Sequence, residues 1–446
     1  MDEQRSNQRP NNPRRRHRTR MQVIKEDYLP VFVVIIGLIL IFTFIIGSIV
    51  RGVQRKRYQR DTAQQQLIAS QQSQAALEKE AADLLAEAAV LAADYDYDGA
   101  IAVLDRFSGD MYAFKDLSAK YAEYATAADS LVLWEDPNAI YNLSIHPLIA
   151  DPERAFAGTN FYAENYITVE EFTKLLPQLY ENGYMLIKHS DIVIKDGKMD
   201  LKLPKGKKPL IITETQVNYN TSLIDKGFAS KLILDENGKL TNQMIDKDGN
   251  TVTGAFDIVP ILNAFIETHP DFSYRGAKAI LALTGYDGLF GYRTSSKNPE
   301  ENREVEKEAV KKIIAAVKAE GYELACYTYS NEAYGTKSTD FIRSEMELWK
   351  SEVTPLLGEV NLFIFALKSD IAEKGVSYSG EKFEILKSYG FTDYLGFADD
   401  GKPWFNSYDN YTRMGRIMIT GLNLQEHPDW FDKIFDAYSV KDKARN

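Results

Sequence analysis

Short apolar runs alternate with longer amphipathic segments over most of residues 140–425. The clearest apolar runs lie at 209–212, 279–283, 324–326 and 362–366. Strands of this length that alternate with helices are typical of a parallel sheet covered by helices on its faces. We therefore expect an α/β fold over this region, either a (β/α) barrel or an open sheet.

Local signals place several boundaries within this region. Thr168, followed by Glu171 three residues later, predicts the start of a helix that ends near Gly183. Asn237-Gly238 and Asp248-Gly249 predict tight turns in a polar hairpin. Residues 184–194 read as a strand, with His189 and Asp191 on its solvated rim.

The N-terminal part of the chain follows a different pattern. Residues 29–50 form an uncharged run of 22 residues, long enough to cross a bilayer core as a helix. Residues 1–27 are rich in Asn, Pro and Arg and are expected to be a disordered basic tail. We predict a single-pass membrane helix at 28–50. The eight basic residues before it and the five in residues 51–60 modestly favour a cytoplasmic N-terminus and an extracytoplasmic body.

Residues 51–133 are predicted to be helical. Residues 54–93 contain neither Pro nor Gly and are rich in Ala, Gln, Glu and Leu, which are mostly strong helix formers. Two further amphipathic segments follow and predict a helical hairpin. A single hairpin cannot bury its own apolar face, so it must pack on the stalk helix, on the next domain or on another chain. The stalk is thus a candidate for self-association or for binding a protein partner.

Composition narrows the classes of function. The net charge is −11 although the tail is basic, so the body is acidic and is not expected to bind nucleic acid. Cys326 is the single cysteine, which excludes a disulfide framework and a cysteine-based zinc site.

One predicted strand carries polar residues where α/β proteins place their chemistry. Thr213, Glu214, Thr215 and Gln216 follow the apolar run 209–212 at its C-terminal end. Neighbouring residues on a strand point to opposite faces. Glu214 should therefore face away from Thr213 and Thr215, toward a salt bridge at the rim or the edge of the core.

The order and spacing of the elements between about residues 142 and 425 resemble the polysaccharide deacetylase (NodB-homology) family. The resemblance rests on the stretches 146–149, 166–184, 207–213 and 321–326, and it spans roughly two thirds of the chain. It implies a distorted (β/α) barrel within residues 134–446. It also implies a deacetylase site in which a divalent metal, usually zinc, is held by one Asp and two His.

The family's site positions carry other residues in this chain. Aligned with the motif Thr-Phe-Asp-Asp-Gly, Thr215 stands at the catalytic base and Gln216 at the metal-binding Asp. Tyr327 and Asn331 stand at the two His of the second motif, and Ile364 stands at the Arg of the third. Neutral oxygens bind zinc poorly, and loss of a general base alone costs about 10²–10⁴ in rate.

The resemblance thus implies the fold, while the substitutions imply no zinc cofactor and no catalytic residues of the family type. We expect a pseudoenzyme that binds cell-wall polysaccharide or a partner through Thr215, Gln216, Tyr327 and Asn331. Two alternatives stay open. One is an active carbohydrate de-N-acetylase or hydrolase that uses other residues, and the other is an envelope assembly scaffold driven by the stalk.

Three more residues are candidates for the same cleft. Tyr292 and Arg293 lie in the Gly-rich loop 285–295, where an aromatic ring and a guanidinium suit a sugar. Ordinary loop packing explains them equally well. His146 stands at a predicted strand end, where it either points into the cleft or is a hydrogen-bonded structural residue before Pro147.

Overall fold

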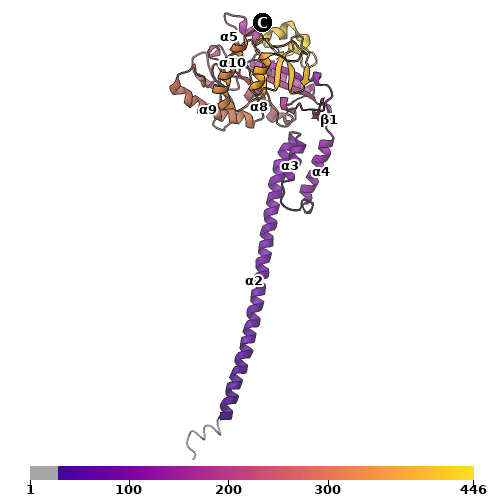
Figure 1. The fold of residues 1–446 in the computed structure, drawn as a ribbon, viewed down its shortest axis with the longest axis vertical. Helices are drawn as coiled ribbons and strands as arrows, with labels where there is room; N and C mark the ends of the chain where they lie inside the picture. The colour runs from indigo at the N-terminus through magenta and orange to yellow at the C-terminus, as the bar shows by residue number, and fades with distance from the viewer. Residues whose placement is uncertain (1–28, 446) are drawn as a thin grey trace, which may run out of the picture. The chain divides into compact units, whose positions relative to one another are not determined.

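The computed structural model describes residues 29–445, so the predicted basic tail at 1–27 lies outside the described residues. The chain divides into two compact units, residues 1–80 and 81–446. Helix α2 (Leu29–Ala93) begins at the predicted membrane segment and runs without a break past residue 50 (Figure 1). The predicted stalk therefore continues the same helix.

The apolar part of α2 has the properties of a membrane span. Among residues 29–445, α2 is the helix that is long and apolar enough to cross a membrane. Apolar side chains between Val31 and Val50 are exposed all around it. A lipid environment would remove this surface from water. The orientation of the helix stays a prediction.

The second unit begins with a helical hairpin, as predicted. It consists of α3 (Tyr97–Leu104) and α4 (Lys115–Asp129), with a short 3₁₀ turn at Met111–Ala113 between them. The apolar residues Ala100, Leu104 and Leu117 of the hairpin are buried. Ala81, Leu84 and Ala88 in the last turns of α2 are buried as well. Glu87 of α2 and Arg106 form an exposed ion pair at 2.7 Å.

The rest of the unit is a closed barrel of seven parallel strands. The ring runs β2 (Tyr141–Ile145), β7 (Lys208–Thr215), β11 (Ile280–Leu283), β12 (Glu323–Cys326), β13 (Leu362–Ile364), β14 (Asp393–Phe397) and β16 (Tyr411–Met418). Strand β7 closes it, because it pairs with β2 on one side and with β11 on the other. The first part of β7 also pairs with β3 (Tyr184–Leu186), an additional strand beside the ring. The predicted (β/α) barrel is confirmed by this strand pairing.

Helices cover the outside of the barrel (Figure 1). The longer ones are α7 (Val169–Glu181), α8 (Ile258–Thr268), α9 (Glu300–Ala319), α10 (Thr339–Leu348) and α12 (Glu381–Ser388). Shorter ones are α5 (Pro152–Ala155), α6 (Phe161–Asn165), α11 (Thr354–Leu357), α13 (Gly421–Glu426) and α14 (Ala437–Val440). One apolar core lies between strands and helices, and a second fills the barrel interior.

Two local predictions are confirmed. Thr168 and Glu171 form a capping box at the start of α7. The polar insertion is a three-stranded antiparallel sheet of β8 (Ala229–Leu234), β9 (Leu240–Ile245) and β10 (Thr251–Gly254). Gly238 and Gly249 occupy positive φ values of 77° and 81° in its two turns, a conformation that glycine adopts without a steric penalty.

The predicted strand at 184–194 is wrong beyond Leu186. His189 lies instead in a 3₁₀ turn and is 5% exposed, and its backbone N–H donates to Glu323 at 2.5 Å. The segment turns there because it closes the amino end of the barrel. Its apolar residues Ile187, Ile192, Met199, Leu201 and Leu203 join the interior core.

The sequence pattern also missed the last barrel strand. β16 carries Arg413 and Arg416, both 1% exposed, and pairs with the antiparallel strand β15 (Phe405–Tyr408). A segment of eight residues that contains two arginines is expected to be exposed to solvent, because arginine is seldom fully buried. Only the closed barrel supplies the carbonyl, hydroxyl and carboxylate groups that accept their hydrogen bonds.

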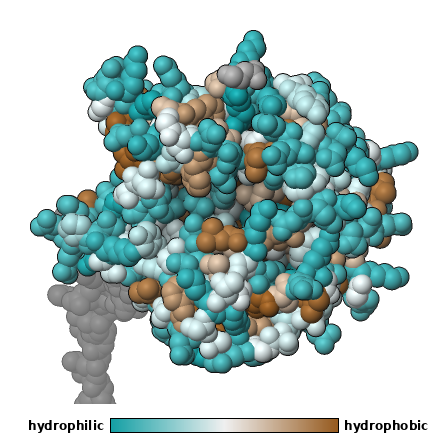
Figure 2. Space-filling model, turned by 90° about the horizontal axis from the view of Figure 1, so that it is seen from above, coloured by the Kyte–Doolittle hydropathy of each residue, from teal (hydrophilic) through white to brown (hydrophobic). Residues whose placement is uncertain are grey.

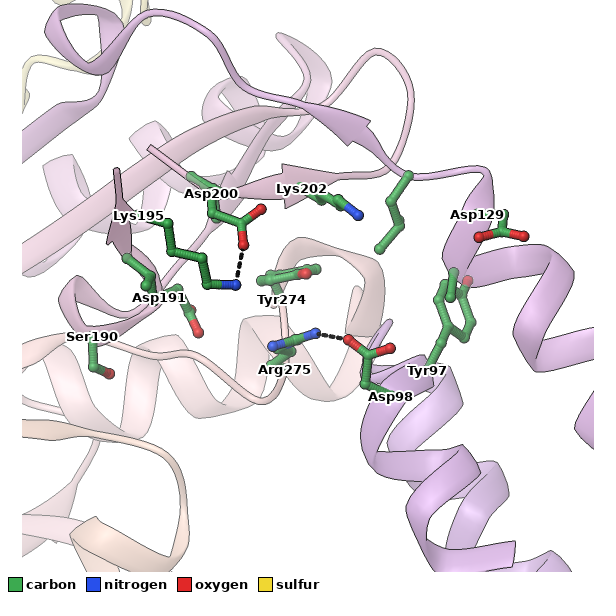
Figure 3. A pocket seen from close by; sticks show the side chains of 14 residues that line it. Tyr97, Asp98, Asp129, Ser190, Asp191, Lys195, Asp200, Lys202, Tyr274 and Arg275 are labelled. Carbon is green, nitrogen blue, oxygen red and sulfur yellow. Dashed lines mark hydrogen bonds and ion pairs between the residues drawn. The ribbon is translucent and has the colours of Figure 1, made fainter. Parts of the chain in front are cut away.

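Arg275 links the helical hairpin to the amino end of the barrel. Its backbone N–H donates to Asp94 O at 2.6 Å. Its guanidinium lies 3.4 Å from Asp96. It also lies 3.1 Å from Asp98 (Figure 3). We expect Arg275→Ala to loosen the hairpin by about 1 kcal/mol, since these pairs are partly exposed.

Amide hydrogen exchange of residues 94–131 measures this loosening, which should speed exchange about fivefold. Arg106→Ala is the control, because it removes an ion pair to Glu87 that does not involve the barrel. Equal exchange in Arg275→Ala and the wild type would contradict the predicted link.

Candidate functional site

Polar side chains gather inside the barrel at the carboxyl ends of its strands. Thr215 ends β7 and is fully buried, and Tyr327 follows β12 and is 3% exposed. Burial raises the pKa of Tyr327, while the charge of Arg416 and hydrogen bonds with Gln216 and Thr215 work in the opposite direction. The structure thus brings Thr215, Gln216 and Tyr327 together. Tyr327 is hydrogen-bonded to both of the others.

His146 joins this group. It follows β2 and approaches Thr215, with Nδ1 2.7 Å from Oγ1. Its ring also packs against Tyr166, with 5.3 Å between the ring centroids. Burial, followed by the charge of Arg416, lowers the pKa of His146 to about 4. His146 is therefore neutral at pH 7. Its hydrogen bond with Thr215 and its packing on Tyr166 fit the prediction of a hydrogen-bonded structural residue, and it does not line the pocket described next.

Gln216 and Asn331 line a pocket of about 300 Å³ at the same end of the barrel. The other lining residues are Asn218, Asn220, Thr284, Tyr286, Ser330 and Glu332. Seven of the eight side chains are uncharged and polar, so the pocket offers hydroxyl and amide groups with a single carboxylate. Such groups can both donate and accept hydrogen bonds.

The backbone around this pocket is unusual. Gln216 and Asn331 have φ values of 62° and 58°, and the fully buried Thr328 has a φ of 54°. A β-branched residue with positive φ is a genuine outlier, which costs of order 1–2 kcal/mol. Strained backbone persists where the surrounding fold holds it in place, and it gathers at binding and active sites.

Arg416 of β16 provides a buried positive charge beside Tyr327, at the carboxyl ends of the strands. It donates to Ser144 Oγ at 2.9 Å and to Phe365 O at 2.8 Å. Burial lowers its pKa to about 10, against the opposing effect of Tyr327 and Asp370. Arg416 is still charged at pH 7. Sequence reasoning missed it, because nothing in the pattern of 411–418 distinguishes a buried arginine from a surface one.

Tyr292 and Arg293 lie outside the pocket. Tyr292 is 8% exposed and packs in the outer core, with Lys231 Nζ 4.2 Å from its ring centroid. Arg293 donates to Asp287 O at 2.9 Å and to Tyr219 O at 2.8 Å. Arg293 also donates to Asn218 O, so its hydrogen bonds hold the loop after β7 in place. Arg293 does not line the pocket itself.

Glu214 faces away from Thr213 and Thr215, as predicted, but the expected salt bridge is wrong. Among residues 29–445, no cation pairs with its carboxylate, and both of its oxygens lack a donor. It lies instead beside Asp257, and both side chains are fully buried. Burial, and then the charge of Asp257, raise the pKa of Glu214 well above its ordinary value of 4.5.

The residues at the family's metal positions do not fit zinc. Thr215, Gln216, Tyr327 and Asn331 offer neutral oxygens, whereas zinc sites use imidazole, thiolate or carboxylate ligands. Within residues 29–445, no group of three or more His, Cys, Asp and Glu side chains could hold a metal ion. The Arg416 charge under the mouth would also repel a divalent cation.

A second polar pocket, of about 390 Å³, lies at the opposite end of the barrel, next to the hairpin (Figure 3). Lys195 and Arg275 project into it, and both are already paired with carboxylates, Asp200 and Asp98. Asp191 also lines it, and burial raises the pKa of Asp191 to about 6. The pocket thus lies where the hairpin meets the barrel, and its ion pair between Arg275 and Asp98 joins the two.

Comparison with known proteins adds little to this description. No protein-family model matches the chain, and no curated protein matches it. Among solved structures, the chain is similar to "Streptococcus pyogenes deacetylase PplD in complex with acetate". The two chains are 11% identical with a TM-score of 0.36, over 65% of this chain and 94% of the other. So distant a likeness supports no statement on function, and the strand pairing alone establishes the barrel.

Proposed function

We propose that this protein is anchored in a membrane by residues 29–50 and that its barrel mouth binds carbohydrate of the cell surface. In this proposal the barrel is a pseudoenzyme, without the metal-dependent deacetylation of the family it resembles. The observation that carries the proposal is the pocket at Gln216 and Asn331, lined by uncharged polar side chains. Hydroxyl and amide groups complement the hydroxyl and acetamido groups of a sugar.

The surface supports a sugar ligand over a protein partner. The face shown in Figure 2 is mostly hydrophilic, with hydrophobic residues in small separate groups. A protein partner would favour a broad apolar patch. Tyr286 is 38% exposed at the pocket. Lys297 Nζ lies 3.1 Å from the centroid of its ring, so a sugar would stack on the opposite face of the ring.

Binding should depend on the two pocket amides. We expect Gln216→Gly and Asn331→Gly each to weaken binding of an N-acetylated chito-oligosaccharide about three- to tenfold, because each removes hydrogen bonds. Glycine is chosen because both positions have positive φ, which it adopts without strain. Isothermal titration calorimetry on the full-length protein in detergent measures the effect.

Asn237→Gly is the control, since Asn237 is exposed at a hairpin turn remote in sequence from the pocket. Zinc content and deacetylation of the same oligosaccharide are measured on the wild type. Stoichiometric zinc with turnover would contradict the pseudoenzyme and favour the active de-N-acetylase. Unchanged binding in both glycine variants would rule out this pocket as the sugar site.

A further inference from the structure

Arg416 is a buried cation without an anionic partner. Its side chain is 1% exposed and forms no ion pair among residues 29–445. Its Nε is buried and has no hydrogen-bond partner. Leaving a charge buried and unpaired is costly, so buried charges are normally paired or ligated. We propose that the barrel mouth binds an acidic saccharide and that Arg416 pairs with the carboxylate of that ligand.

The nearby carboxylates do not serve as the missing partner. Asp370 lies 2.8 Å from Arg413 and accepts a hydrogen bond from the Tyr378 hydroxyl at 2.7 Å. Asp399 pairs with Lys368 at 3.1 Å. The groups within reach of the Arg416 guanidinium are neutral: the Ser144 hydroxyl, the Phe365 carbonyl and the Tyr327 hydroxyl. Within residues 29–445, Asp370 and Asp399 act on the charge of Arg416 from a distance, and no carboxylate forms an ion pair with it.

Arg416 is placed between two pockets at the carboxyl ends of the strands. On one side, the ring of Phe397 lies 4.7 Å from its guanidinium and also lines a pocket of about 590 Å³ with Trp404. On the other side, Tyr327 connects it to Gln216, which lines the pocket of about 300 Å³. Arg416 lines neither pocket itself, so a saccharide that occupied both would have to reach its guanidinium between the rings of Phe397 and Tyr327.

The surroundings favour a carboxylate over a phosphate. Asp370 and Asp399 are near enough to act on the charge of Arg416, so they would repel a dianion more than a monoanion. A planar carboxylate also matches the edge of one guanidinium. This inference rests on the proposed function and narrows the ligand to a sugar that carries a carboxyl group.

The test compares trigalacturonic acid with its methyl ester, which differ in charge at the carboxyl groups. Calorimetry on the full-length protein in detergent is expected to give about tenfold or more tighter binding of the acid. Arg416→Lys keeps the charge but loses the planar fork, and should reduce that preference to about threefold or less. Its affinity for a neutral N-acetylated chito-oligosaccharide should fall less than its affinity for the acid, because the neutral ligand has no carboxylate for the guanidinium to bind.

Arg413→Lys is the matched control. Arg413 lies on the same strand and is equally buried, but it is already paired with Asp370. It should keep the wild-type preference for the acid. Equal binding of acid and ester by the wild type overturns this inference, and needs no variant to fold. If the neutral oligosaccharide still binds, the proposed function stands; if no saccharide binds, both are overturned.

Discussion

Replacing Glu171 by alanine is expected to lower the free energy of unfolding by about 3–5 kcal/mol. Glu171 is fully buried and pairs with Arg445, with Nε–Oε1 at 2.5 Å and Nη2–Oε2 at 2.7 Å. Its carboxylate also accepts the backbone N–H groups of Thr168 and Asp442, at 2.9 and 3.0 Å. The variant leaves the Arg445 charge buried without its partner. Urea unfolding in detergent, followed by circular dichroism, measures the loss.

Glu170→Ala is the control for this prediction. Glu170 is the neighbouring residue on α7, but its side chain is half exposed and pairs with Lys174 on the surface. That change should cost less than about 1 kcal/mol. Equal losses in the two variants would show that the buried pair adds nothing. An Arg445→Met variant and the double variant would then measure the coupling between the two residues.

The Glu171 pair also supports the barrel mouth. Arg445 donates to Tyr166 O at 2.7 Å and to Ala163 O. The ring of Tyr166 packs against His146, which faces Thr215. Glu171→Ala should therefore weaken saccharide binding as well as stability, although Glu171 does not line the pocket.

Replacing Glu214 by glutamine is expected to raise the free energy of unfolding by about 1–3 kcal/mol at pH 8. Asp257 accepts N–H groups of Leu148 and Ile258, both at 2.9 Å, which favours its ionised form. Of these two buried carboxyl groups, Glu214 is therefore the one that keeps a proton. A glutamine amide would supply a permanent donor toward Asp257 and would remove the cost of holding that proton.

The same pair gives the wild type a pH dependence. The pKa of Glu214 in the folded protein lies above 4.5, its ordinary value. As pH rises above about 4.5, the unfolded chain releases a proton that the folded chain keeps, so stability falls until Glu214 ionises in the fold. Urea unfolding between pH 5 and pH 9 should show this decline in the wild type and a flatter curve in Glu214→Gln.

Glu236→Gln is the control for the pH series, because Glu236 is exposed at a hairpin turn. It should keep the wild-type decline. A wild-type stability that did not fall between pH 5 and pH 9, or fell equally in Glu214→Gln, would show that Glu214 does not keep a proton in the folded protein.

Much of the fold could be predicted from the sequence because its signals are local. The capping box at Thr168 depends on residues three apart, and the turns at Gly238 and Gly249 depend on adjacent residues. The apolar runs of β7, β11, β12 and β13 are continuous because both faces of a parallel strand are buried. β16 escaped detection because its two arginines are satisfied only by residues distant in the sequence.

The candidate site could be predicted in part. Thr215, Gln216, Tyr327 and Asn331 were placed at one end of the barrel because the carboxyl ends of parallel strands meet there. The contacts of these side chains could not be predicted from the sequence, because they depend on residues distant along the chain. Arg293 was predicted to bind a ligand, but it holds a loop in place through hydrogen bonds to backbone carbonyl groups. Glu214 was predicted to form a salt bridge, but it lies beside Asp257.

The sequence by itself therefore determined the α/β class, the apolar helix and the polar residues at the strand ends, since each is set by periodicity or by neighbours along the chain. The tertiary structure alone decided which charges meet. Ring closure brings Arg416 of the last strand close enough to His146, which follows the first strand, for its charge to help lower the pKa of that histidine. Contacts across some 270 residues, as between Glu171 and Arg445, are fixed by packing and leave no periodic trace in the sequence.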